Sequence, residues 1–189
     1  MFLLKSILSL ILLVSSFAIA AKTIETVEFK YFVISPQSPN DIRHELIRNS
    51  PIRNQQSLFT IHANWSIDWE YKAAPGPNGC KLYDIKTKVY VVHTLPTLSE
   101  QVTDKQTIET FNKFNDALTQ HQDKHGNIGL SAAREIDETL QTIQPQQNCQ
   151  HLARMVGATG RSIVQKYIRY DHEYDRTTNY GETEGAVIY

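Results

Sequence analysis

The sequence predicts an α+β fold in which an antiparallel sheet packs on helices. Two observations support this. Before Pro96, apolar side chains alternate with polar ones, and after Pro96 they recur every three or four residues. A period of two is typical of a half-buried strand, and a period near 3.6 of a helix with one apolar face. Strands followed by helices along the chain favour the α+β class.

The N-terminal half is predicted to begin with a strand and a short helix. Residues 23–35 are rich in β-branched and aromatic side chains, which favours a strand. A helix is then expected to start at Ser38, with Ser38 as its N-cap and Pro39 at its first position. It should stop before Pro51, because the residue preceding a proline avoids the helical conformation.

A long hairpin follows. Residues 59–71 place apolar side chains at alternate positions, which predicts a strand with one buried and one solvent-facing side. Turn-forming residues over 73–79 separate this run from a second alternating run over 83–95. Two such runs joined by a short turn predict an antiparallel hairpin.

Helices are predicted for the second half. Thr103 and Gln106 are spaced as a capping box. A second helical stretch over 130–143 follows directly or after a kink near 126–129. The last helix is expected over 149–170, and the tail over 171–189 is expected to be irregular, with a candidate short strand at 186–189. One face of the first helix carries residues spaced by three and four: Ile108, Phe111, Phe114, Leu118, His121 and His125.

Residues 1–20 have the layout of a secretory signal peptide. Lys5 supplies a positive charge, residues 7–14 form an apolar run, and Ala18-Ile19-Ala20 provides a small-residue cleavage site. The run is short for a membrane span, which needs about 20 residues. We therefore predict a single mature domain over 21–189, periplasmic or secreted, without a stable membrane span once the signal is cleaved. The alternative is an uncleaved N-terminal anchor.

Cys80 and Cys149 are the two cysteines of the 189-residue chain. An exported protein meets an oxidising compartment, which favours joining them in a disulfide. The closed loop of about 70 residues would stabilise the fold by roughly 4 kcal/mol in the chain-entropy model. The alternative is two independent buried thiols.

The composition is that of a globular protein with no broad basic surface. Hydrophobic residues make up 41% of the chain and charged residues 21%, and the formal net charge is −1. Proteins that bind nucleic acid without sequence preference carry an excess of Lys and Arg. We therefore expect no nucleic-acid partner.

The pair His121 and His125 is the strongest candidate for chemistry. Two histidines four residues apart on a helix point the same way, and this spacing can hold one Zn²⁺ through ring nitrogens at about 2.0–2.1 Å. The pair continues the apolar stripe of its helix, so we expect it to face the interior, where a polar ring needs a partner. The alternative is two core histidines bonded to carboxylates or carbonyls.

Several features in a fixed order carry a family resemblance. Over about residues 31–186 the chain resembles a bacterial family of predicted secreted Zn-dependent proteases, which is also described as a domain of unknown function. The features are Trp65-x-x-x-Trp69-x-Tyr71, Cys80, Leu95-Pro96, the histidine pair, Cys149, and the tail Tyr174-Asp175-x-x-Thr178-x-Tyr180-Gly181-x-x-x-Gly185-Ala186.

The resemblance implies a zincin-like fold, a zinc cofactor and a His-Glu-x-x-His helix with a further His in the tail. His121 and His125 match the helical ligands, whereas Gln122 stands at the position of the Glu and Tyr180 at that of the tail His, as third ligand. An amide cannot accept a proton near neutral pH, and losing a general base costs on the order of 10²–10⁴ in rate. The resemblance thus implies an exported zinc-metallopeptidase-like protein with a degenerate site and weakened or lost peptidase activity, a pseudoenzyme.

Two alternatives stay open. The first is a non-catalytic envelope binding protein that holds a peptide or protein partner on the retained scaffold. The second is a structural envelope protein in which both histidines belong to the core. Further residues near Tyr180 in sequence are candidates to complete a metal site, and Glu182 could supply an oxygen ligand or a base: His172, Glu173, Glu182 and Glu184.

Overall fold

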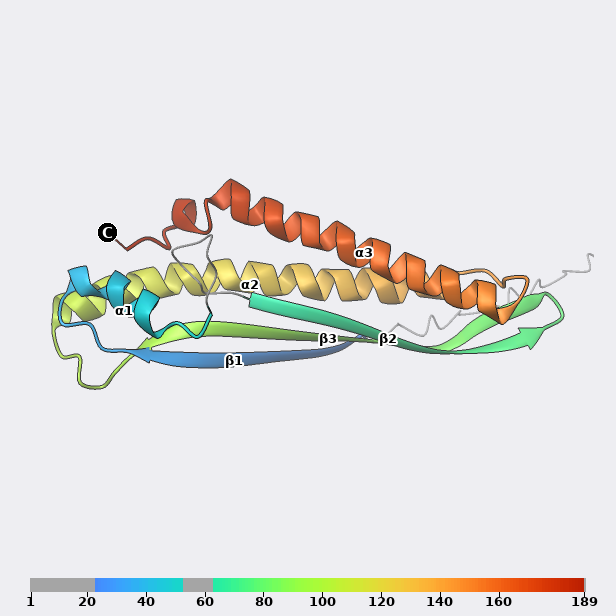
Figure 1. Cartoon of the computed structure of the whole chain (residues 1–189), viewed down its shortest axis with the longest axis horizontal. Coiled ribbons are helices and arrows are strands. Elements are labelled where there is room, and N and C mark those ends of the chain that lie inside the picture. The colour runs from blue at the N-terminus through green and yellow to red at the C-terminus, as the bar shows by residue number, and fades with distance from the viewer. Residues whose placement is uncertain (1–22, 53–62, 189) are drawn as a thin grey trace, which may run out of the picture.

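The described part of the chain consists of a three-stranded sheet and three helices, which confirms the α+β class (Figure 1). The computed structural model describes residues 23–52 and 63–188; the predicted signal peptide and part of the predicted strand over 59–71 lie outside these residues. The strands are β1 (Ile24–Ile34), β2 (Ala63–Gly76) and β3 (Gly79–Leu98). The helices are α1 (Ile42–Asn49), α2 (Lys105–Gln141) and α3 (Cys149–Thr178), with 3-10 turns at Pro39–Asp41 and Glu182–Glu184.

The sheet has the order β1-β3-β2 and is mixed, so the prediction of an antiparallel sheet is wrong for one strand. β2 and β3 form the predicted antiparallel hairpin, with Ala63 opposite His93. β1 instead runs parallel to β3, with Ile24 beside Lys88. Parallel neighbours need a long crossover, which α1 and β2 supply. An alternating pattern shows which side chains are buried but not the direction of the neighbouring strand.

The hairpin is longer than predicted, because β2 continues through Gly76 and only Pro77 and Asn78 form the turn. Pro75 is tolerated since β2 is an edge strand, where one backbone N–H needs no ladder partner. The start of β3 is tied to the loop before α3: the Cys80 N–H donates to the Gln146 carbonyl at 2.7 Å, and the Gln146 N–H donates back at 2.8 Å.

At two helix starts the observed capping hydrogen bonds differ from the predicted ones. Ser38 holds the N-cap position before the turn at Pro39–Asp41, but its side chain makes no capping hydrogen bond. α1 ends before Pro51, as predicted. At α2 the side chain of Asp104 accepts the Thr107 N–H at 2.8 Å, so the predicted capping box of Thr103 and Gln106 is wrong. A carboxylate one residue later is the stronger acceptor at the positive end of a helix.

α2 is one continuous helix of 37 residues, so the two predicted helical stretches follow directly without a break. Its glycines lie where it meets the sheet. A Cβ at Gly129 would come 2.5 Å from Cγ of Trp65, and one at Gly126 would come 2.9 Å from the His93 ring. Glycine is therefore kept at these positions for close approach to β2 and β3 rather than for a kink.

α3 has 30 residues, so the prediction of an irregular chain after residue 170 is wrong as far as Thr178. The helix stops where Asn179 and Tyr180 adopt left-handed conformations, with φ of 47° and 56°. Residues 186–188 form no strand; Ala186 and Ile188 instead pack into the core. The last turns of α3 carry few apolar residues and are held by polar contacts of Asp171 and Asp175, so apolar periodicity does not reveal them.

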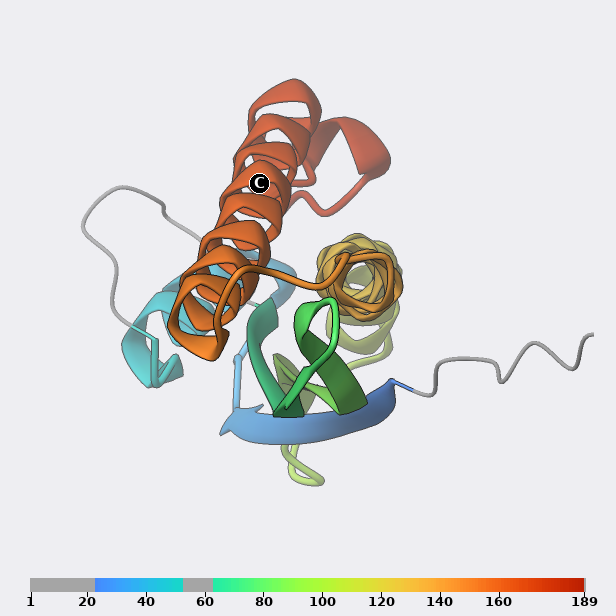
Figure 2. The same ribbon diagram turned by 90° about the vertical axis from the view of Figure 1, so that its right-hand side faces the viewer.

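Both long helices lie on one side of the sheet, with α2 running along it and α3 packed against α2 (Figures 1 and 2). One apolar cluster gathers around Phe114 near the start of α2. Two others lie further along α2, around Val89 and around Leu140. Between residues 118 and 133 the buried face of α2 carries the two histidines. In the described part of the chain, no helix is both long enough and apolar enough to cross a membrane.

Cys80 and Cys149 are joined by a disulfide, as predicted, with 5.0 Å between their Cα atoms. The bond ties the start of β3 to the first residue of α3. It therefore holds α3 at the hairpin end of the molecule, while the other end of α3 reaches the histidines of α2.

Candidate metal centre

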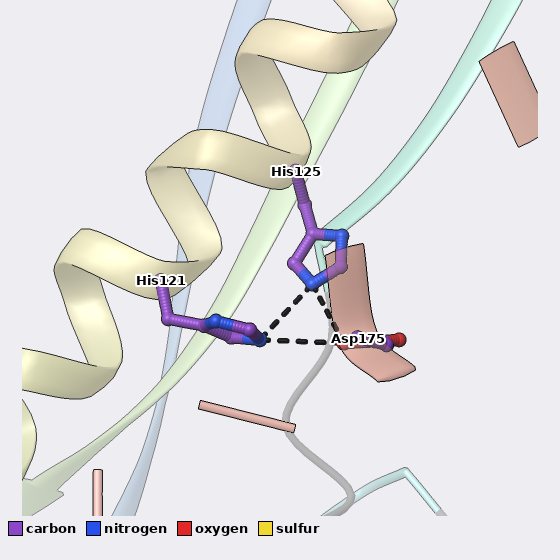
Figure 3. A group of neighbouring side chains, drawn as sticks. All are labelled: His121, His125 and Asp175. Atoms are coloured by element: carbon purple, nitrogen blue, oxygen red, sulfur yellow. Dashed lines mark hydrogen bonds and ion pairs between the residues drawn. The ribbon is translucent and has the colours of Figure 1, made fainter. Parts of the chain in front are cut away.

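His121 and His125 lie on α2 and converge with Asp175 of α3 (Figure 3). The two Nε2 atoms are 3.1 Å apart. Oδ1 of Asp175 lies 3.0 Å from Nε2 of His125 and 3.3 Å from Nε2 of His121. Both rings are 2% exposed, which confirms the prediction that the pair faces the interior.

Matched spacing on two helices produces this arrangement. The histidines are four residues apart on α2, and Asp171 and Asp175 are four residues apart on α3. Residues with this spacing share a helix face, one turn apart. Because α2 and α3 pack side by side, the carboxylates of one helix meet the imidazoles of the other.

Each histidine is also held at its second ring nitrogen. Nδ1 of His121 lies 2.8 Å from Oε2 of Glu184, and Nδ1 of His125 lies 2.7 Å from Oδ1 of Asp171. An ionised carboxylate can only accept, so each Nδ1 donates its proton and each neutral ring presents Nε2 as an acceptor. Two Nε2 atoms and a carboxylate oxygen then converge with no donor among them, an arrangement that needs a proton or a cation.

The pKa of His125 shows what the metal-free cluster does. Burial alone would lower this pKa, but the hydrogen bonds to Asp171 and Asp175 outweigh burial and raise it to about 9. Burial would likewise raise the pKa of Asp175, but its bonds to His121 and His125 hold it well below its usual range. Without metal, the cluster therefore retains a proton at neutral pH. The carboxylates of Asp171 and Asp175 therefore stabilise a positive charge between the two histidines.

The C-terminal tail closes over His121. Burial would raise the pKa of Glu184, but hydrogen bonds from Lys124, Tyr174 and His121 lower it to about 2. Burial and the bond to Glu184 raise the pKa of Tyr174, which stays a neutral donor and stacks on the His121 ring at 4.7 Å. Gly181, with φ of 87°, allows the close approach, since a Cβ there would lie 3.1 Å from the ring.

The three converging atoms fit a tetrahedral metal ion. Ligands bound at 2.0–2.1 Å in a tetrahedron lie about 3.3 Å from one another, and the separations here are 3.0–3.3 Å. Two imidazoles and a carboxylate are a donor set of catalytic zinc sites. Carboxylates behind ligating imidazoles, the positions of Asp171 and Glu184, orient the rings and fix their tautomers.

The predicted site residues differ in burial. Gln122 is buried beside His121 on α2, whereas Tyr180 is 52% exposed. Glu184, one of the further candidates, contacts His121 through Nδ1. The other candidates, His172, Glu173 and Glu182, are exposed.

Neither Asp175 nor Asp171 is among the site residues predicted from the sequence. Asp175 stands in the tail motif Tyr174-Asp175, but the sequence predicts an irregular tail. The usable signal is the repeated spacing of four, because Asp171 and Asp175 match the pair His121 and His125 once α3 is extended to Thr178. Because α3 continues to Thr178, its face with Asp171 and Asp175 reaches the two histidines of α2.

Comparison with known proteins places the chain in one family. No curated protein matches the chain, and no solved structure does. The model of a family described as bacterial proteins of unknown function (DUF922) matches residues 29–182, a range that contains both histidines and Asp175. The chain therefore belongs to the DUF922 family of bacterial proteins.

Proposed function

We propose that this chain is an exported, zincin-like protein that binds zinc through His121, His125 and Asp175, with weak or absent peptidase activity. The observation that carries the proposal is the convergence of two buried imidazole nitrogens and one half-buried carboxylate oxygen at separations of 3.0–3.3 Å. The Cys80–Cys149 disulfide supports export, because such bonds persist in oxidising compartments.

Weak peptidase activity follows from the residues around the centre. Bound zinc would supply Lewis-acid chemistry, polarising a carbonyl group. The side chain beside His121 that would take up a proton is the amide of Gln122, which cannot do so near neutral pH. Both imidazoles are 2% exposed, so a peptide bond has little access to them.

A non-catalytic envelope protein that holds a peptide or protein partner is the second candidate. The burial of both histidines favours it over an active enzyme, since a metal site closed to substrate stabilises a fold, whereas a catalytic site keeps a position open. In that case zinc would hold the end of α3 and the C-terminal tail against α2. Peptide hydrolysis separates the two candidates. A protein that binds zinc but cleaves no peptide, even as the Gln122→Glu variant, is the non-catalytic envelope protein.

Metal analysis of the mature, disulfide-bonded chain tests zinc binding. After equilibration with zinc and dialysis, we expect about one zinc per chain in the wild type. His121→Ala, His125→Ala and Asp175→Asn should each lose most of it. His172→Ala, an exposed histidine on α3, is the matched control and should retain it. Zinc content that is absent in the wild type, or unchanged in the three variants, would contradict the proposal.

A further inference from the structure

β1 is an edge strand with an exposed apolar stripe. In the sheet order β1-β3-β2, one side of β1 pairs with β3, and no strand within residues 23–52 and 63–188 pairs with its other side. Alternate side chains of β1 are 46–64% exposed although they are apolar. They form the β1 stripe: Val27, Phe29, Tyr31 and Val33.

The β1 stripe lies on the same side of the sheet as the helices. Phe29 stacks on His93 with ring centroids 4.9 Å apart, and His93 is a buried residue of β3 next to Gly126 of α2. Glu25, which also belongs to the odd-numbered face of β1, accepts a hydrogen bond from Arg134 of α2 at 2.8 Å. Because α2 packs on β3 and β2, the β1 stripe extends beside the helix rather than under it.

A long apolar edge strand is a hazard that proteins normally cover, because its free N–H and C=O groups pair with another strand. The charges of β1 indicate which strand fits. A twofold axis that relates two antiparallel strands is perpendicular to the sheet and keeps both copies facing the same way, so the positions of two directly opposite residues are both odd or both even. With Phe29 opposite itself, Glu28 of each strand faces Lys30 of the other, and Val27 faces Tyr31.

The neighbouring registers are unfavourable. Moving the axis by one residue toward the N-terminus places Glu28 opposite itself, and moving it by one residue toward the C-terminus places Lys30 opposite itself. Opposite charges facing each other stabilise a strand pair, and like charges destabilise it. The sequence of β1 is therefore self-complementary in one register, centred on Phe29.

We propose that two copies of this chain pair through β1 in that register, forming a continuous six-stranded sheet with a twofold axis at Phe29. Both α2 helices then lie on one side of the sheet, each over its own β3. The two β3 strands are about 14 Å apart, three strand spacings. Helices in contact are 8–10 Å apart, so the two β1 stripes fill the space between the helices. The dimer does not depend on zinc.

Cross-linking at the axis tests the register. Cys80 and Cys149 are bonded to each other, so an introduced cysteine is the one free thiol of the described residues. In Phe29→Cys the two thiols face each other, within the Cα separation of roughly 4.4–6.8 Å that a disulfide needs. In Tyr31→Cys, the matched control on the same stripe, they are roughly 14 Å apart. Mild oxidation should give a covalent dimer for Phe29→Cys and not for Tyr31→Cys.

Charge reversal tests the pairing. We expect light scattering to give twice the chain mass for the wild type. Glu28→Lys and Lys30→Glu each place like charges in both cross-strand pairs and should weaken dimerisation roughly tenfold or more. The double reversal restores opposite charges and should restore the dimer. Circular dichroism and melting temperature verify that each variant is folded, and Lys81→Glu on the hairpin is the control for a charge change elsewhere.

Three results would overturn the proposal. They are a wild-type monomer at 100 µM, equal cross-linking of the two cysteine variants, and a double reversal that remains monomeric while folded. A monomer that instead captures an added peptide strand would assign the edge of β1 to a different partner and would equally overturn the dimer.

Discussion

Each histidine of the candidate metal centre is held at both ring nitrogens, and this determines how single substitutions act. Nε2 of each ring points to the shared centre, and Nδ1 points to Glu184 or Asp171. The carboxylates behind the rings would therefore affect metal affinity without touching the metal. Without metal, the hydrogen bonds to Asp171 and Asp175 raise the pKa of His125 to about 9, so the proton that His125 carries at neutral pH is shared within the cluster.

Removing one of these supporting carboxylates should weaken zinc binding. Glu184→Gln and Asp171→Asn keep the shape of the side chain but weaken its acceptance of the Nδ1 proton. We expect a 10–100-fold loss of zinc affinity for each, as is typical of residues behind metal ligands. Glu182→Gln, an exposed neighbour in the same tail, is the control and should leave the affinity unchanged. Competition with a chromogenic chelator measures all three, and equal affinities would show that the carboxylates do not support the site.

Restoring a carboxylate beside His121 should raise peptidase activity. Gln122→Glu introduces a group that can accept a proton, and the gain would reach the order of 10²–10⁴ if the missing base alone limits the rate. Gln122→Met, similar in size but without a carboxylate, is the control and should show no gain. Peptide hydrolysis with zinc-loaded protein is the measurement. A gain in both variants would point to altered packing around the buried position 122 rather than to a base.

Tyr180→His, combined with Gln122→Glu, tests the third ligand expected from the family resemblance. Because Asp175 already completes the converging group and Tyr180 is 52% exposed, we expect this change to leave zinc content unaltered. A clear increase in zinc content would mean that the tail residue, not Asp175, completes the site.

The stability of the metal-free protein should fall as the pH rises. The folded-state pKa of His125 is about 9, above the ordinary value of 6.5. A raised pKa stabilises the fold fully below about pH 6.5, and this contribution disappears as the pH rises through 9. The loss should be on the order of a few kcal/mol in the free energy of unfolding. Urea unfolding at pH 6 and pH 9.5 in a chelator measures it, and His125→Gln should show a flatter dependence.

The two long helices approach the sheet through glycines that face tryptophans. On α3, a Cβ at Gly160 would overlap the indole of Trp69, whereas a Cβ at Gly157 would meet only the far end of the flexible Arg161 side chain. Alanine in a helix is otherwise favoured over glycine by about 1 kcal/mol. Replacing glycine by alanine should therefore destabilise the protein at position 160 but not at position 157, three residues earlier on the same helix.

We predict that Gly160→Ala destabilises the protein by roughly 1–3 kcal/mol, because the overlap with Trp69 forces backbone or side-chain shifts. Gly157→Ala, the matched control, should be neutral or stabilising by up to about 1 kcal/mol. Thermal and urea unfolding of both variants measures the difference. Equal effects of the two changes would mean that α3 packs less closely on β2 than the structure shows.

α3 is attached at both of its ends, in addition to its apolar packing. The disulfide joins its first residue to β3, and the polar contacts of Asp171 and Asp175 join its last turns to the histidines of α2. Cys80 and Cys149 are 69 residues apart in sequence, and bridges that close long loops restrict the unfolded chain most. The two attachments lie at opposite ends of α3, and the apolar packing lies between them.

Replacing both cysteines by serine should lower the free energy of unfolding by about 2–5 kcal/mol. Urea unfolding of Cys80→Ser/Cys149→Ser against the oxidised wild type measures the loss, and reduced wild type is the control for the added serine hydroxyls. We expect the double variant to keep zinc binding, because the metal ligands lie at the opposite end of α3. A change below about 0.5 kcal/mol would show that the bridge adds nothing to the contacts that already hold α3.

Local patterns in the sequence determined most of the elements and half of the site. β-branched and aromatic content predicted β1, alternation predicted the hairpin, three-to-four spacing predicted α2, and the lone cysteine pair predicted the disulfide. The inward direction of His121 and His125 also followed from spacing, because residues four apart on an amphipathic helix share the face that is buried. Each of these patterns depends only on residues close together in the sequence, within a few turns of a helix or within one strand.

Contacts between distant segments decided the rest. The parallel pairing of β1, the last turns of α3 and the role of Asp175 depend on partners 46 to 63 residues or more away along the chain. Direction in a sheet is set by backbone hydrogen bonds, which every residue except proline offers alike. The end of α3 is held by carboxylates that meet imidazoles of α2, a gain that exists only once the two helices are packed. Local patterns record which side chains are buried, and only the tertiary structure decides which of the buried polar groups meet.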